Sequence, residues 1–525
     1  MSMTVSSHPA PRRRLVFIAV VLVLFSSVCM YLYLVGLLSQ LSSSVAPVSA
    51  SGQSQRASPP SQLLARQWYA PASTWINNLT SVLHDSGVHG FIFNASAPPP
   101  SAEPSQYNWC NMPHVNPQTY STPPRQFELV YVEVIHRHHK RTPYQDNSFP
   151  VESYPWDCSD QSLFFYGQPL GPDADVNSSA QVYWQIQTNP INPFRANGFA
   201  GSCQFPQITR HGLEDSWRHG KDLRDVYGGK VNFLPPTPDA TVVYRVTSNT
   251  ITSQVAGMLI RGMFSSSQLN NFPLSIQPPQ IDSLHPGYDC PRASSLYSSY
   301  AVGSSDQKWR LHLDRAQAIF QALDAVSGIP PGDDGFHRSF DHYYDNLSAR
   351  QCHQKALPCS ASNPQHCITQ DQADTVYRIG QYEYSYIYRD SHESLEAAIG
   401  SYGVWVAELI SNIREALSGR SLVRYRHNIA HDGSLARLLS ILQVKVMVWP
   451  GMGAEIVFEI YKHKHTSGHF VRILWGGKPL ESSHPGLGKV DMIDLEVLVG
   501  YLEGLVGREA QKVVEMCNCA LEDVC

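Results

Sequence analysis

Phe127-Glu-Leu-Val-Tyr-Val-Glu-Val-Ile135 predicts the central strand of this chain. It is short, rich in β-branched and aromatic residues, and preceded by the proline pair Pro123-Pro124, a pattern that predicts a buried strand. The next residues, His136-Arg-His-His-Lys-Arg-Thr-Pro143, place two arginines and a lysine among histidines. This concentration of positive charge at the end of a strand is unfavourable unless an anion binds there. Phosphate meets that requirement.

The side chains of this basic loop have the chemistry of a phosphate site. Arg137 and Arg141 each offer a planar fork of donors to phosphate oxygens. A neutral imidazole between them, His138, is a nucleophile that needs no deprotonation. For these eight residues alone, a solvated basic loop is the alternative interpretation.

A second group of polar residues lies about 290 residues further along the chain. His431-Asp432-Gly433 forms a polar turn, and an apolar-periodic helix is predicted to begin near Ser434. The first turn of a helix presents unpaired amide donors, so an anion held near His431 and Asp432 would be stabilised there.

Together these segments resemble the histidine acid phosphatases, the second branch of the histidine phosphatase superfamily. The family signature is Arg-His-Gly-x-Arg-x-Pro, and Arg137, His138, Arg141 and Pro143 match it, whereas His139 replaces the glycine. His431-Asp432 resembles the His-Asp element of the same family. The resemblance covers roughly 126–525 and is clearest at its two ends.

The resemblance implies a role for each of these residues. His138 would attack phosphorus and form a phosphohistidine, Arg137 and Arg141 would bind the phosphate, and His431 would donate a hydrogen bond and positive charge. Asp432 would be the general acid, and no metal or cofactor is required. The expected substrate is a phosphorylated small molecule or glycan. The alternative is a weak or inactive relative that binds a phosphorylated glycan or inositol phosphate.

Two positions depart from the family pattern. Ile251 stands where the family has its third phosphate-binding arginine. Either Arg245 or Arg261 reaches in from nearby, with Arg245 predicted to bind substrate, or the pocket suits a bulkier phosphate. His139 adds a side chain where close approach of the backbone is expected. Activity that is low, altered in substrate or absent is therefore one expectation.

The predicted fold is α/β, with a central, mostly parallel sheet flanked by helices and an inserted helical cap. The core is assigned to 125–265 and 420–525, the cap to 266–419, and an N-terminal extension to 67–124. Further strands are predicted at 241–246, 455–461 and 469–475, the last two joined as a hairpin. Within the cap, helices are predicted at 307–326, 373–388 and 395–416.

The N-terminus predicts membrane attachment. Arg12-Arg13-Arg14 precede Leu15 to Leu38, an uncharged segment that at about 1.5 Å per residue can cross a hydrocarbon layer of about 30 Å. The basic residues on its N-terminal side predict a cytosolic tail over 1–14 and a lumenal or extracellular remainder, with a flexible stem over 39–66. The protein is thus expected to be a single-pass type II membrane protein of the secretory pathway. The alternative is secretion after cleavage near Ala46 to Ala50.

Cysteines and sequons agree with a secretory location. Ten of the 11 cysteines lie outside the predicted span and permit five disulfides whose connectivity the sequence leaves open. Glycosylation sequons begin at Asn78, Asn94, Asn177 and Asn346. The net charge of −5 over 525 residues, without a long basic stripe, gives no indication of nucleic-acid binding.

Overall fold

The computed structural model describes residues 67–92, 106–150, 154–161, 164–165, 182–187, 189, 191–194, 201–264 and 272–519. The chain divides into two units, Met1–Ser58 and Pro59–Cys525, and every described residue belongs to the second. None of the helices in the described ranges is both long and apolar enough to cross a membrane. The predicted tail, membrane span and stem lie outside these ranges and stay predictions.

A mixed sheet forms the centre of the second unit, in the order β10-β8-β7-β1-β6-β4-β5, with β9 paired to β8. The predicted central strand is β1 (Phe127–Arg137), which pairs in parallel with β6 (Tyr425–Ala430) and antiparallel with β7 (Glu455–His463). The other strands of this sheet are β4 (Val242–Val246), β5 (Leu274–Ser275), β8 (His469–Trp475), β9 (Lys478–Pro479) and β10 (Ile493–Asp494).

The prediction of a mostly parallel sheet is wrong. β1, β6, β4 and β5 run parallel, but β7, β8, β9 and β10 add antiparallel pairings on the other side of β1. The cause is the short connection between β7 and β8, because a hairpin loop can join only antiparallel strands. The α/β class, with a central sheet flanked by helices, is confirmed.

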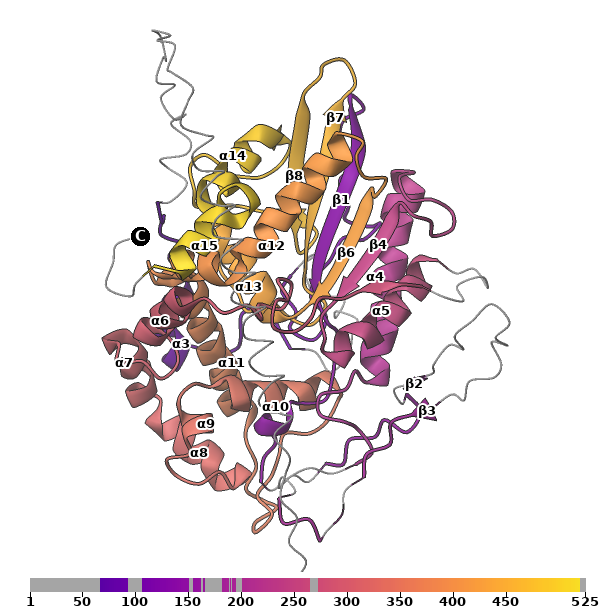
Figure 1. The fold of residues 1–525 in the computed structure, drawn as a ribbon. Coiled ribbons are helices and arrows are strands. Elements are labelled where there is room, and N and C mark those ends of the chain that lie inside the picture. Colours follow the sequence, from indigo (N-terminus) through magenta and orange to yellow (C-terminus); the bar gives the residue numbers. More distant parts are fainter. Residues whose placement is uncertain are drawn as a thin grey trace, which may run out of the picture. The chain divides into compact units, whose positions relative to one another are not determined.

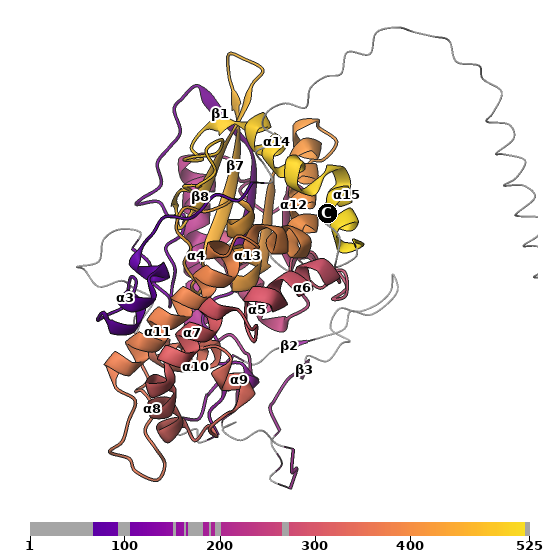
Figure 2. The same cartoon turned by 90° about the vertical axis from the view of Figure 1, so that its left-hand side faces the viewer.

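Each face of the sheet is covered by helices, as the alternation of side chains along β1 requires. Tyr131 and Ile135 belong to a core shared with α12 (Ser394–Leu417), α13 (Asp432–Ile441) and α14 (Leu495–Val506). Val132 and Val134 belong to a second core, shared with α4 (Arg210–Arg224) and α5 (Thr250–Met263). Figures 1 and 2 show α4 and α12 on opposite sides of the sheet.

The helices between β5 and α12 group beyond the end of the sheet at which β1 and β6 finish (Figures 1 and 2). They are α6 (Pro291–Tyr300), α7 (Gln307–Arg315), α8 (Gln317–Ser327), α9 (Asp334–His337), α10 (Asp341–Cys352), α11 (Gln370–Ser385) and the π-helical turn η5 (Tyr386–Asp390). The remaining described elements are η1 (Trp75–Asn77), α3 (Leu79–His84), η2 (Gln145–Asn147), β2 (Phe164–Phe165), β3 (Val182–Tyr183), η4 (Asp225–Lys230), η6 (Arg508–Ala510) and α15 (Gln511–Cys517). Residues 266–419 thus hold both the grouped helices and α12, which packs on the sheet itself.

Four disulfides join described cysteines: Cys110–Cys352, Cys158–Cys203, Cys290–Cys517 and Cys359–Cys367. The first and third join residues 242 and 227 positions apart, so they tie distant segments of the unit together. A fifth pairing would involve Cys525, which lies outside the described residues.

The predicted glycosylation sequons differ in accessibility. Asn78 is exposed and caps α3, so its sequon stays a prediction. Asn94 and Asn177 lie outside the described residues. Asn346 is fully buried, and its amide donates to the carbonyl of Asn147 and accepts from Arg350. A glycan has no room there in the folded protein, so the prediction that Asn346 is glycosylated is wrong. Its side chain instead forms buried structural hydrogen bonds.

Candidate active site

The register of two parallel strands brings the two predicted site segments together. Arg137, the last residue of β1, pairs with Ala430, the last residue of β6. The next residues, His138 and His431, therefore emerge side by side at the carboxyl ends of the strands, and the amide of His138 donates to the carbonyl of Ala430 at 3.1 Å. The centroids of the two imidazole rings are 5.4 Å apart. One phosphate-sized anion could contact both.

His138 is held in the form that a nucleophile requires. Its Nδ1 lies 3.0 Å from the carbonyl oxygen of His139, which can only accept, so Nδ1 carries the proton and Nε2 keeps a lone pair. Burial, together with the positive charge of Arg137 and Arg141, lowers the pKa of His138 well below its ordinary value. The ring is therefore neutral.

His431 occupies the N-cap position of α13. Its Nε2 lies 3.0 Å from the hydroxyl of Thr247, at the end of β4. Burial, together with the nearby His285 ring and two arginines, lowers the pKa of His431 to about 3, although Asp432 opposes this shift. The imidazole is thus neutral before an anion binds, and the positive charge predicted for it requires a bound dianion to raise that pKa.

Asp432 is paired with Arg137. Its Oδ2 lies 3.0 Å from the Arg137 guanidinium and accepts a 2.9 Å hydrogen bond from the indole of Trp449. Burial alone would raise the pKa of Asp432, but Arg137, the Trp449 hydrogen bond and Arg141 outweigh it and lower that pKa. Arg137 also donates to the carbonyl of Pro450 at 2.6 Å and stacks on Trp109. Carboxylate and guanidinium therefore hold each other in place.

Arg141 has a different acidic partner, Asp345 of α10, at 3.0 Å. The same carboxylate accepts from the Tyr144 amide and the Asn147 side chain, and the guanidinium lies 4.1 Å above the Tyr144 ring. α10 thereby fixes the direction of Arg141.

A cavity of about 290 Å³ lies between the basic loop that follows β1, here also called the catalytic loop (136–143), and the grouped helices. Arg137, Arg141 and Asp432 line it, whereas the rings of His138 and His431 are buried and form no part of its wall. Its aromatic residues are Trp109, Tyr144, Tyr384, Tyr388 and Trp449, and its further acids are Asp341, Asp345 and Glu383. Two guanidinium groups and several aromatic rings in the same lining give a place for an anion attached to a compact organic group.

Arg245 is not brought to this cavity. Its guanidinium is bound to Glu408 at 2.7 Å and to Asp282 at 3.0 Å, and it forms no part of the cavity wall. The prediction that Arg245 binds substrate is therefore replaced by a structural role. Ile251 is fully buried in the core beside α4 and α5, so the position of the family's third arginine is apolar here.

Several residues of the site were missed by sequence reasoning. Asp345 and Tyr144 flank Arg141, Trp109 and Trp449 flank Arg137, and His285 lies with its ring 4.7 Å from that of His431. Each comes from a segment with no motif. Only Tyr144, directly after Pro143, was close enough in sequence to be a candidate.

Comparison with known proteins identifies the family of the chain. The family model for the histidine phosphatase superfamily (branch 2) matches residues 128–475. The chain therefore belongs to that family, as the sequence resemblance predicted.

Among curated proteins, the chain is 23% identical to 2-phosphoxylose phosphatase 1 of Mus musculus over 72% of this chain and 77% of that protein. It is also 23% identical to lysophosphatidic acid phosphatase type 6 of Bos taurus, over 67% of this chain and 78% of that protein. Among solved structures, the phytase of Klebsiella sp. ASR1 aligns with a TM-score of 0.48 at 14% identity, covering 77% of this chain and 99% of the phytase.

Proposed function

We propose that this chain is a phosphomonoester hydrolase of the acid phosphatase type that works through a phosphohistidine on His138. One observation supports this function most directly. The ring centroids of His138 and His431 are 5.4 Å apart, and each histidine is a sequence neighbour of cavity-lining residues, Arg137 for His138 and Asp432 for His431, in a chain of the histidine phosphatase superfamily. A nucleophile, two cationic groups, a hydrogen-bond donor and an acid are thus present together.

In the first step, Nε2 of His138 attacks phosphorus, the N–P bond forms and the P–O bond to the leaving group breaks. Negative charge on the equatorial oxygens is stabilised by the guanidinium groups of Arg137 and Arg141, with a hydrogen bond from His431. Bound phosphate competes with Asp432 for Arg137 and so raises the pKa of Asp432. The protonated carboxyl then donates its proton to the departing alkoxide.

In the second step, water attacks the phosphohistidine and the N–P bond breaks. The carboxylate of Asp432 accepts the proton of the attacking water, which returns the acid to its starting form and releases inorganic phosphate. Because Ile251 supplies no third guanidinium, each lost charge-assisted hydrogen bond costs roughly 1.5–3 kcal/mol of phosphate binding. We therefore expect weaker phosphate binding than a three-arginine site would give.

The cavity indicates the size of the substrate. A volume of about 290 Å³ suits a monophosphate on a group the size of one sugar ring, and its aromatic walls suit the apolar face of such a ring. Two relatives are named for phosphatase activity on phosphoxylose and lysophosphatidic acid, and the first fits this cavity better. Binding of a phosphorylated ligand without turnover is less favoured, because the neutral nucleophile and the acid are both in place.

The test is hydrolysis of an aryl phosphate and of sugar monophosphates by the purified full-length chain, compared with its His138→Ala variant. His465→Ala is the control, because this histidine is exposed on the hairpin between β7 and β8. We expect turnover by the wild type and the control and none by His138→Ala. Equal rates for all three proteins, or phosphate binding without turnover in the wild type, would reject the proposed function.

A further inference from the structure

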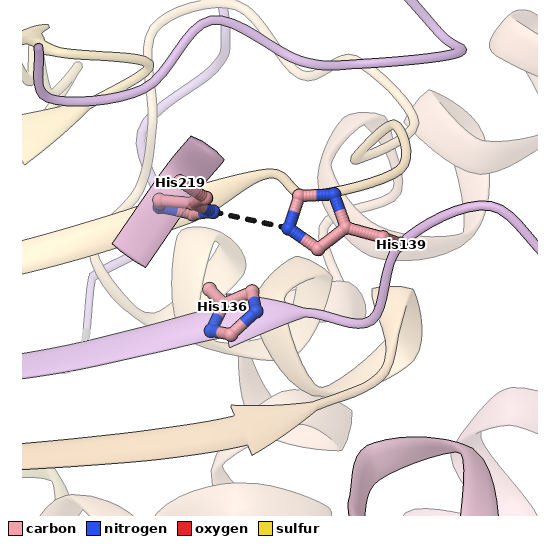
Figure 3. Close-up of side chains that lie close together, drawn as sticks. All are labelled: His136, His139 and His219. Atoms are coloured by element: carbon pink, nitrogen blue, oxygen red, sulfur yellow. Dashed lines mark hydrogen bonds between the residues drawn. The ribbon is translucent and has the colours of Figure 1, made fainter. Parts of the chain in front are cut away.

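A cluster of three buried histidines lies behind the catalytic loop, and the phosphatase mechanism does not use it. His136 belongs to β1, His139 to the loop after it, and His219 to α4. All three side chains are fully buried, and their nearest ring nitrogens lie within 4.8 Å of one another. Figure 3 shows His139 and His219 joined by a hydrogen bond, with the ring of His136 beside the space between them.

The separation of two of these nitrogens fits a metal ion. Nε2 of His139 and Nδ1 of His219 are 3.2 Å apart. Two nitrogens at about 2.0–2.1 Å from a tetrahedral Zn²⁺ are separated by roughly 3.3–3.4 Å. The separation of His139 Nε2 and His219 Nδ1 is therefore close to that of two nitrogen ligands on one tetrahedral Zn²⁺.

The third nitrogen, Nε2 of His136, is buried and has no hydrogen-bond partner among the described residues, whereas Nδ1 of the same ring lies 2.7 Å from Nε2 of His427. A buried polar nitrogen without a partner costs free energy unless something occupies the space it faces.

Hydrogen bonds to the other ring nitrogens of His219 and His136 orient these two rings. His219 Nε2 lies 2.9 Å from the carboxylate of Glu455, the first residue of β7, and His136 is supported by His427. Metal-bound histidines commonly donate their other nitrogen to a carboxylate or another acceptor in this way. Glu455 is itself fully buried, and no lysine or arginine in the described part of the chain forms an ion pair with it. A cation on His219 would place positive charge next to this carboxylate.

The histidine at position 139 is also a departure from the family signature, which has glycine there. The fold accommodates it, because a Cβ added to Gly453 would lie 2.5 Å from the His139 ring. A glycine at 453 thus leaves the space that the additional ring occupies.

We propose that His136, His139 and His219 bind a first-row transition-metal ion that prefers imidazole ligands, Zn²⁺ foremost, as a structural site behind the catalytic loop. His136 Nε2, His139 Nε2 and His219 Nδ1 are the ligand atoms. Because the side chains are fully buried, the ion enters as the chain folds. Its effect is to hold the backbone on both sides of His138 by fixing its neighbours at 136 and 139.

The experiment measures metal content and does not depend on activity. The full-length chain is expressed in an oxidising secretory host with added Zn²⁺, freed of loosely bound ions by gel filtration, and analysed by elemental mass spectrometry. We expect about one zinc per wild-type chain, and less than roughly a tenth of that in His139→Gly and His219→Gln. His312→Gln is the matched control, because His312 is equally buried and bonded to a glutamate, Glu383, and it should keep the metal.

The melting temperature before and after chelation distinguishes loss of the metal site from misfolding of a variant. His139→Gly restores the family residue and is expected to fold even if His219→Gln does not. Extraction of zinc by a strong chelator should lower the melting temperature of the wild type and leave that of His139→Gly unchanged. A wild-type chain without stoichiometric zinc, cobalt, nickel or copper, or a His139→Gly variant that retains as much metal as the wild type, would overturn the proposal.

Discussion

At the residue scale, the hydrogen bond that fixes His138 decides which nitrogen can react. The carbonyl of His139 accepts from Nδ1 and so leaves Nε2 free. The carboxylate of Asp432 is tied to Arg137 in the same way until substrate arrives. In the proposed mechanism, these two side chains perform the attack and the proton transfer.

Asp432→Asn tests the acid. Because Arg137 and the Trp449 hydrogen bond outweigh burial and lower the pKa of Asp432, kcat/KM for an alkyl phosphate should rise as pH falls toward that pKa. The variant should lose this acidic dependence and turn over alkyl phosphates about 10²–10⁴-fold more slowly, but aryl phosphates much less so, since their leaving groups need no proton. The measurement is kcat/KM as a function of pH for an alkyl and an aryl phosphate, in the wild type and in Asp432→Asn. An equal loss for both, with the pH dependence unchanged, would assign the acid elsewhere.

At the element scale, the positions of His138 and His139 after β1 depend on contacts with the loop before β7. The amide of Gly453 donates to the carbonyl of His138 at 3.1 Å, and Gly453 has φ +71° directly against the His139 ring. Sequence patterns do not predict this contact, because the two segments are more than 300 residues apart.

Gly453→Ala should therefore lower the free energy of unfolding by about 1–3 kcal/mol through strain and overlap with His139. In a His139→Gly background the overlap disappears, so a double-mutant cycle should give a coupling of about 0.5–3 kcal/mol. Gly488→Ala is the matched control, since Gly488 has φ +52° and open space, and it should show no coupling with position 139. Denaturant unfolding of the variants measures both values. Additive effects for Gly453→Ala and His139→Gly would contradict the contact.

The strands were largely predictable from the sequence. The predicted strand 469–475 coincides with β8, and 241–246 and 455–461 differ from β4 and β7 only at their ends. Alternation of apolar residues determines such short elements locally. The predicted helix 307–326 is instead two helices, α7 and α8, separated at Ala316.

The site could be predicted only in part. Motif residues at the ends of adjacent parallel strands meet because the register of β1 and β6 brings them together. The acidic partners of Arg141 and Arg245 depend on contacts between segments far apart in sequence. Ile251 was recognised as a departure, but only the fold shows that Arg245 is held by Glu408 and Asp282 and does not replace the missing arginine.

At the scale of the whole molecule, one long-range disulfide connects the cavity wall to the grouped helices. Cys110–Cys352 joins the segment that carries Trp109 to the end of α10, the helix that carries Asp345. Both residues hold arginines of the site. The bond therefore fixes the distance between the two sides of the cavity.

Replacing Cys110 and Cys352 by serine should lower the free energy of unfolding by about 2–5 kcal/mol and weaken inhibition by inorganic phosphate. The same change at Cys359 and Cys367, which are only 8 residues apart, should cost less and leave phosphate inhibition unaltered. Thermal unfolding and inhibition constants measured side by side make the comparison. A larger loss from the short disulfide would argue against this role for the long one.

Transfer of phosphate to His138 is the central claim, and rapid acid-free quenching of the enzyme with a ³²P-labelled substrate tests it most directly. We predict a phosphoryl group that is stable to base and labile to acid, that maps to the peptide containing His138, and that is absent from His138→Ala. Turnover without such a label, or a label that persists in His138→Ala, would contradict the mechanism.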